Sequence, residues 1–376
     1  MARGDKKTEA SVKPINPAES LPFPSRAISD RLLAWYGRKG RDLPWRNTRD
    51  PYRVWLSEVM LQQTTVAAVV PYYHRFLDRF PTLQVLAEAS LDEVIQYWAG
   101  LGYYSRARNL HRAARQVAAE FGGNFPDTQE ELCALPGIGR STAGAILSIA
   151  FDQPAPILDG NVRRVLVRLF AWTEDPRSSR AERRLWQWAE VLTPSDRAHD
   201  YAQAIMDLGA MVCVPRRPSC RFCPLNDFCR AFQEGLADIL PLKRPRKAVP
   251  LRRQAVLLAC WQARLLVTRR PPKGLLGGLW EFPVVDLNQA QPHGKQLQRL
   301  QNDLGLPGNL RHLGTIRHVY SHFKLELEVH ALDLEDRLLV AEGEQRWCPM
   351  NELSQLPLHG AHDKALEVFL KDVERE

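Results

Sequence analysis

The sequence predicts an all-α domain followed by an α+β domain. Between residues 27 and 235 apolar residues recur at helical spacing and strand-like alternation is scarce, whereas beyond residue 254 the apolar period changes to two. At 376 residues the chain is longer than one ordinary domain, and its 45% hydrophobic residues can fill two cores.

The first element is a polar, proline-containing tail, residues 1–26, which we predict to be disordered. It has no apolar run that could act as a secretory signal, and no later stretch approaches the ~18 apolar residues of a membrane span. We therefore expect a cytoplasmic protein with no membrane partner and with reduced thiols.

Helices are expected in the all-α domain, 27–235, with Pro, Gly and Asp at the joints between them. Their most periodic stretches are 52–80, 91–121 and 141–150. Residues 236–253 are rich in proline and basic side chains, so we predict a linker there. In the last domain, 254–376, the alternating or apolar runs 255–267 and 324–332 predict strands.

The net charge restricts the classes of partner. A net charge of +8 favours a polyanion such as nucleic acid as the partner, although a merely basic protein would have the same charge.

Four clustered cysteines indicate a metal site. They have the spacing C-x6-C-x2-C-x5-C within 213–229 and are Cys213, Cys220, Cys223 and Cys229. Thiolates this close need a metal or cluster to hold them, and ligand type alone leaves zinc open. Arginines stud the loop, as a phosphate-facing surface would require: Arg216, Arg217, Arg221 and Arg230.

The remaining cysteines, Cys133, Cys260 and Cys348, are scattered among apolar neighbours and are predicted to be core residues.

The segment LPGIGRSTAGAILSIA, residues 135–150, predicts a tight turn between two helices. Gly137 and Gly139 leave backbone N–H groups accessible at the start of the second helix, which is a site for a DNA phosphate. The segment matches the helix-hairpin-helix motif.

Two carboxylates are candidates for catalysis. On a helix, Glu58 has Val54, Trp55 and Leu61 three or four positions away, so its carboxyl points along a largely apolar face. Burial there would raise its pKa and keep a proton available for general acid catalysis, whereas a surface glutamate is the ordinary alternative. Asp159 stands at an Asp-Gly helix start, where a simple N-cap role is the alternative.

Together these motifs resemble the adenine DNA glycosylases of the MutY type, in the endonuclease III superfamily. The matching runs are WLSEVMLQQT, GLGYYSRARNL, LPGIGRSTAGA, ILDGNV and the cysteine loop, and the resemblance extends from Ala27 to the C-terminus. It implies a [4Fe–4S] cluster on the four cysteines. It also implies a bacterial, nucleoid-associated monomer that acts on double-stranded DNA with A:8-oxoguanine or A:G mispairs.

The resemblance also implies catalytic roles. Glu58 would protonate a ring nitrogen of adenine, and Asp159 would stabilise the oxocarbenium-like sugar or trap it covalently, with Asn161 orienting them. Ser141 stands where strand-cutting relatives carry a nucleophilic lysine, and Arg163 replaces a lysine of other relatives. We therefore predict a monofunctional glycosylase.

Further site residues follow from the same resemblance. Four would wedge into the duplex around the lesion: Gln63, Thr64, Leu101 and Tyr103. Taken singly, each has an ordinary alternative, since tyrosine and leucine on helices are most often core residues. Three would line the adenine pocket: Trp45, Arg46 and Gln203.

The last domain resembles the Nudix fold. Its segment KQLQRLQNDLGL lacks the paired acidic residues that hold magnesium in Nudix hydrolases, so nucleotide hydrolysis is not expected. Tyr320-Ser321-His322, followed by Phe323, matches a Phe-Ser-His element with which the family recognises 8-oxoguanine. Ser321 and His322 as ordinary surface residues are the alternative.

Three other functions fit the sequence less well. A thymine- or pyrimidine-specific glycosylase is disfavoured by Glu58 and the last domain, and a Nudix hydrolase by its missing acidic helix. A catalytically silent DNA-binding or redox-sensing protein is disfavoured by the presence of both Glu58 and Asp159.

Overall fold

The computed structural model describes residues 24–242, 249–271, 274, 276–287, 292–320, 322–335 and 344–374. Most of the predicted tail, 1–26, and the middle of the predicted linker therefore lie outside the described residues. The chain divides into two compact units, one formed by residues up to 59 with 124–245 and the other by 60–123 with 246–376.

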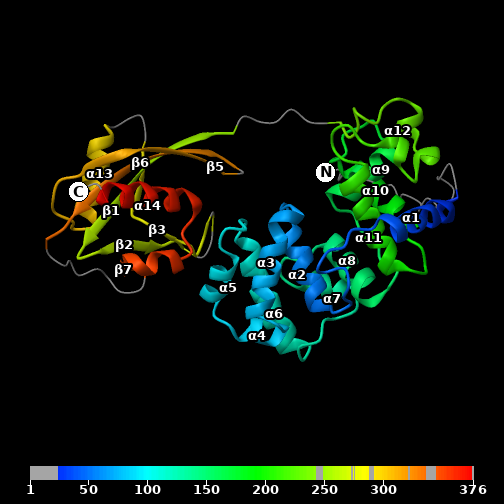
Figure 1. Ribbon diagram of the computed structural model, residues 1–376, viewed down its shortest axis with the longest axis horizontal. Coiled ribbons are helices and arrows are strands. Elements are labelled where there is room, and N and C mark those ends of the chain that lie inside the picture. The colour runs from blue at the N-terminus through cyan, green and yellow to red at the C-terminus, as the bar shows by residue number, and fades with distance from the viewer. Residues whose placement is uncertain are drawn as a thin grey trace, which may run out of the picture. The chain divides into compact units, whose positions relative to one another are not determined.

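The first unit is helical (Figure 1). Its helices surround an apolar core. Its helices are α1 (Ser25–Lys39), most of α2 (Pro51–Leu61), α7 (Gln129–Ala134), α8 (Arg140–Phe151), α9 (Gly160–Leu169), α10 (Ser179–Leu192), α11 (Ala198–Asp207) and α12 (Arg230–Gln233). A π-helical turn, Leu208–Val212, continues α11, and the 3-10 turns Cys220–Phe222 and Asn226–Phe228 follow it. Apolar residues at helical spacing supply the core, for example Ile28 and Leu32 of α1, both 0% exposed.

The second unit contains four helices from residues 60–123: α3 (Val66–Arg79), α4 (Leu83–Glu88), α5 (Leu91–Trp98) and α6 (Ser105–Glu120). The starts of α3, α4 and α5 are set locally, because Thr65, Thr82 and Ser90 each accept a hydrogen bond from the backbone N–H three residues later.

The rest of that unit is an α+β fold. Its strands are β1 (Leu251–Trp261), β2 (Arg264–Arg269), β3 (Trp280–Glu281), β4 (Val284–Asp286), β5 (Arg311–Val319), β6 (Lys324–Asp333) and β7 (Gln345–Pro349). Their order is β3-β2-β1-β6-β5, with β4 also pairing with β1 and β7 with β2. The central pair β1–β6 is parallel, from Leu251↔Lys324 to Cys260↔Asp333. Helix α14 (Gly360–Val373) packs on β5 and β6 (Figure 1). Helix α13 (His293–Asp303) contacts β4.

The predicted fold class, a helical domain followed by an α+β domain, is confirmed, while several boundaries differ. Helix α1 begins at Ser25, within the predicted tail. The predicted linker is shorter, because Leu240 is buried in the first core and Leu251 already starts β1, where it pairs with β6. Among the described residues, no helix combines the length and apolarity needed to cross a bilayer.

Candidate active site

Glu58 lies on α2 between buried side chains. Trp55 is 0% exposed and Val54 1%, which are the apolar neighbours that its sequence position predicted. Burial raises the pKa of Glu58 to about 7; the nearby Asp159 charge adds to this rise and Arg46 opposes it. At neutral pH a large fraction of Glu58 is therefore protonated.

Asp159 is the N-cap of α9, and it belongs to the same site. Its Oδ1 accepts the backbone N–H of Val162 at 2.7 Å. Burial raises the pKa of Asp159, while the N–H groups of Val162 and Asn161 and the charge of Arg164 act in the opposite direction. Hydrogen bonds and a cation thus favour the ionised form of Asp159, whereas burial, the larger effect, favours its neutral form.

Asn161 is fixed by a neighbour that the sequence did not reveal. Arg164 donates to Asn161 Oδ1 at 2.8 Å and to the carbonyl of Gly209 at 2.7 Å. Asn161 therefore turns its amide nitrogen toward Asp159 Oδ2, 3.4 Å away. The π-helical turn approaches closely here, since a Cβ on Gly209 would lie 2.7 Å from Asn161 Cβ. In the sequence, the i,i+3 spacing of Asn161 and Arg164 was the pattern from which this contact could have been predicted.

Arg46 is held by a buried carboxylate that sequence reasoning also missed. Asp207 is 0% exposed and accepts Arg46 Nη2 at 2.7 Å and Arg41 Nη2 at 2.7 Å. Arg46 also lies beside the Tyr36 ring hydroxyl, whose pKa is raised mainly by burial. No described residue accepts a hydrogen bond from Arg46 Nε or Nη1, although both atoms are buried. Two donors next to Glu58 are thus left for another molecule.

The other two predicted pocket residues are buried in the first unit. Trp45 is 4% exposed and Gln203 1%. Gln203 lies on α11 one turn before Asp207, so the two side chains occupy one face of that helix.

The predicted hairpin joins α7 to α8. Gly137 has φ +82°, a conformation that favours glycine, and Gly139 is the N-cap of α8, with no side chain over the helix start. Ser141 Oγ accepts the N–H of Leu158 at 3.0 Å, which ties the start of α8 to the residue before Asp159.

The four cysteines line one small cavity together with Arg168. Burial, and the neighbouring thiols, raise the pKa of Cys223 to about 12 and of Cys229 to about 11. Arg168 is 1% exposed and donates to Cys213 Sγ at 3.3 Å. Four converging sulfurs with a buried cation against one of them fit a thiolate-ligated iron–sulfur cluster.

The arginines of this loop are exposed, as a phosphate-facing surface requires: Arg216, Arg217, Arg221 and Arg230. Of the other cysteines, Cys348 is buried and Cys260 is intermediate. Cys133 is exposed, so its predicted core role was wrong: α7 turns Leu132 inward and Cys133 outward.

The predicted duplex wedges are brought together by a buried arginine. Arg106 donates to Met60 O at 2.6 Å, to Thr64 Oγ1 at 3.1 Å and to Gly102 O at 3.1 Å. Gln63 (φ +60°) and Tyr103 (φ +51°) adopt strained left-handed backbone in these two loops, and Tyr103 is 37% exposed.

Leu101, in contrast, is 7% exposed and is a core residue in this conformation, so inserting it into DNA would require it to leave the core.

In the α+β part, Tyr320 follows β5 and His322 is exposed, while Ser321 lies outside the described residues. The Tyr320 hydroxyl lies 2.8 Å from His359 Nδ1, a partner that sequence reasoning missed.

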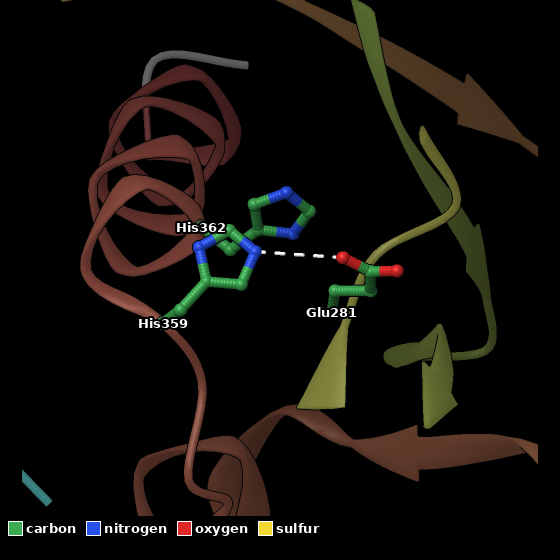
Figure 2. Close-up of side chains that lie close together, drawn as sticks. All are labelled: Glu281, His359 and His362. Atoms are coloured by element: carbon green, nitrogen blue, oxygen red, sulfur yellow. Dashed lines mark ion pairs between the residues drawn. The ribbon is translucent and has the colours of Figure 1, made fainter. Parts of the chain in front are cut away.

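Figure 2 shows His359 beside Glu281 and His362. His359 Nε2 is 3.5 Å from Glu281 Oε2, and Arg270 pairs with the same carboxylate. His362 Nδ1 accepts the N–H of Phe282 at 2.9 Å, whereas His362 Nε2 is buried and has no hydrogen-bond partner among the described residues. The chain of contacts from Arg270 to Tyr320 fixes the Tyr320 ring.

Comparison with known proteins is consistent with this geometry. Residues 56–191 match the HhH-GPD superfamily of base excision DNA repair proteins, and residues 255–368 match the NUDIX domain. Adenine DNA glycosylase of Mus musculus is 40% identical over 91% of this chain and 78% of its own length, and that of Buchnera aphidicola (strain Sg) is 36% identical over 80% and 86%. A thermostable thymine-DNA glycosylase structure superimposes with a TM-score of 0.52 and 29% identity over 56% of this chain and 97% of its own.

Proposed function

This chain belongs to the adenine DNA glycosylase family, and from that premise we propose that it removes adenine paired with 8-oxoguanine or G in double-stranded DNA. It is a DNA glycosylase, a hydrolase of base excision repair. The observation that carries the finer proposal is the pairing of a largely neutral Glu58 with an ionisable Asp159 in one site.

The two carboxyl groups have different roles in the reaction. The Glu58 carboxyl donates its proton to a ring nitrogen of adenine, the N-glycosidic bond breaks, and its electron pair leaves with the base. Asp159, ionised and oriented by Asn161, stabilises the positive charge that develops on the sugar or bonds to C1′. Water then adds to C1′, which breaks the Asp159–C1′ bond where one has formed and releases the carboxylate, and the water gives a proton to Glu58, which completes the hydrolysis.

Recognition of adenine is supported by the unsatisfied donors of Arg46. Adenine carries ring-nitrogen acceptors, and Arg46 offers Nε and Nη1, both buried and without an acceptor among the described residues. A buried site that must hydrogen-bond its substrate rejects bases that leave its groups unpaired.

The excision rate should fall as pH rises through about 7. Glu58 has a pKa raised to about 7, so the acid form that donates the proton is present below that pH and is lost above it. Asp159 must be ionised, and burial raises its pKa, so the rate should also fall on the acidic side. Single-turnover adenine release across the pH range measures both limbs. A rate that stays constant well above pH 7 would exclude Glu58 as the acid.

We further propose that Cys213, Cys220, Cys223 and Cys229 hold a [4Fe–4S] cluster, supported by their shared cavity and by Arg168. The cluster would cross-link the 213–229 loop and so hold its exposed arginines in position to bind DNA phosphates. Iron and sulfide analysis of the purified chain tests this, and stoichiometric zinc would contradict it.

The proposed enzyme is monofunctional. Ser141 and Arg163 provide no amine with an accessible lone pair, since a serine has none and Arg163 is held by Glu182 and the carbonyl of Pro176. Borohydride should trap little protein on DNA that is losing adenine, whereas Ser141→Lys should raise the trapped fraction. Efficient trapping of the unaltered chain would overturn the assignment.

We propose that residues 27–235 form the catalytic domain and that 254–376 reads 8-oxoguanine. The support is the resemblance at Tyr320 to His322, together with the fixed Tyr320 ring and the exposed His322. A nucleoid-associated monomer in the cytoplasm is part of the same proposal.

His322→Ala should lower the preference for A:8-oxoguanine over A:G by about tenfold, the order expected from losing one good hydrogen bond. Single-turnover release from the two duplexes gives the ratio. The rate on A:G serves as the internal control, because the catalytic residues are untouched. An unchanged ratio would remove His322 from lesion recognition.

A further inference from the structure

Helix α11 presents three polar side chains at four-residue intervals on one face: His199, Gln203 and Asp207. Asp207 holds Arg46, whose charge acts on Glu58, so this face belongs to the candidate active site. Sequence reasoning selected Gln203 but not its neighbour His199.

The surroundings of His199 determine the tautomer of its neutral ring. Its Nδ1 lies 2.7 Å from the carbonyl oxygen of Ile149 on α8, and a carbonyl can only accept. The ring proton of neutral His199 is therefore on Nδ1, and Nε2 has a lone pair that must accept. Asp152 Oδ1 accepts the backbone N–H of His199 at 2.8 Å and fixes the helix start.

This acceptor determines how Gln203 is oriented. Gln203 Nε2 lies 2.7 Å from His199 Nε2 and 3.3 Å from the His199 carbonyl, so the amide NH₂ donates to both. The Gln203 oxygen must then point away from His199. It is buried and accepts no hydrogen bond from any described residue, although Gln203 is only 1% exposed. A buried acceptor without a donor is a costly arrangement that a ligand would relieve.

We propose that His199 is a specificity-determining positioning residue: by accepting from the Gln203 amide it leaves Gln203 Oε1 to accept a hydrogen bond from the exocyclic amine of the excised purine. The inference rests on the proposed function of the Glu58 site. With Oε1 as acceptor, a 6-amino purine is favoured and a 6-oxo purine, whose C6 oxygen is itself an acceptor, is disfavoured. A reversed amide would invert that preference.

His199→Lys tests the proposal, because a lysine ammonium only donates and would draw Gln203 Oε1 toward itself. The experiment measures single-turnover release of three bases opposite 8-oxoguanine: adenine, hypoxanthine, and unsubstituted purine, which has nothing at C6. We expect the adenine-to-hypoxanthine rate ratio to fall by at least about tenfold in His199→Lys. The adenine-to-purine ratio should fall with it. An adenine-to-hypoxanthine ratio that stays at the wild-type value in His199→Lys would overturn the proposal.

Two further variants keep the test decisive if His199→Lys does not fold. His199→Glu retains an acceptor and should preserve the ratio, whereas His199→Met has none and should lower it. Equal ratios in these two variants would also overturn the proposal. His74→Lys, the same change at an exposed site on α3, is the matched control and should keep the wild-type ratio.

Failure of the proposed function is distinguishable from failure of this inference. If the unaltered chain releases no adenine from any duplex, the proposed function is wrong, and with it the basis of the proposal. If the unaltered chain releases adenine but substitution of His199 does not change the adenine-to-hypoxanthine rate ratio, the proposed function stands and the proposed role of His199 is wrong.

Discussion

Glu58→Gln should lower the adenine release rate by about 10²–10⁴-fold, the range that a general acid contributes. Glutamine preserves the shape of the side chain between Val54 and Trp55 but has no acidic proton, so the leaving base must depart as an anion or take its proton from water. The measurement is single-turnover release from an A:8-oxoguanine duplex at about pH 6, where Glu58, with a pKa of about 7, is largely protonated.

Binding separates this chemical effect from a structural one. Glu58→Gln should retain its affinity for the same duplex, since the hairpin and the 213–229 loop are unchanged. Glu88→Gln, an exposed glutamate on α4, is the matched control and should react at the wild-type rate. A Glu58→Gln enzyme that works within a few-fold of wild type would mean that another group supplies the proton.

Asp159→Asn should lower the rate by about 10²–10³-fold, the size of losing one preorganised electrostatic group. Asparagine is also a good N-cap and can still accept the N–H of Val162, so α9 should remain intact. The charge is then the only property removed. Single-turnover release and thermal unfolding of the same preparation test both parts.

Asp159→Ala provides the contrast, because it removes the cap as well as the charge. It should lose about 1 kcal/mol of folding stability in addition to its activity. If Asp159→Asn were active while Asp159→Ala was only less stable, Asp159 would be a helix cap and nothing more.

The sequence predicted those features that short-range spacing encodes. The apolar neighbours of Glu58 stand three and four positions away on one helix, and the four cysteines lie within one short loop, so both sites could be predicted from local pattern. The change of apolar period after residue 254 predicted the α+β part for the same reason.

What the sequence could not reveal are partners far apart in the chain. Asp207 meets Arg41 across 166 residues, and no local pattern pairs them. His359 reaches Tyr320 across 39 residues, and His199 meets the carbonyl of Ile149 across 50. Such contacts depend on how helices and strands pack, which periodicity does not specify.

The exposure of single side chains also could not be predicted from the local sequence pattern. Leu101 and Cys133 stand in short turns or helices where one position of rotation decides between core and solvent. Cys133 is exposed, the reverse of what its core prediction required, whereas Leu101 is buried in this conformation, as its core alternative predicted.

The central claim, that this chain is a monofunctional glycosylase for adenine mispaired with 8-oxoguanine, is tested most directly by single-turnover base release. The duplexes carry A opposite 8-oxoguanine, A opposite G, and T opposite G. We predict rapid adenine release from the first, slower release from the second and none of thymine from the third, with strand breakage only after added alkali. No release from any duplex by cluster-loaded protein that binds DNA tightly would contradict the account and identify a catalytically silent DNA-binding protein.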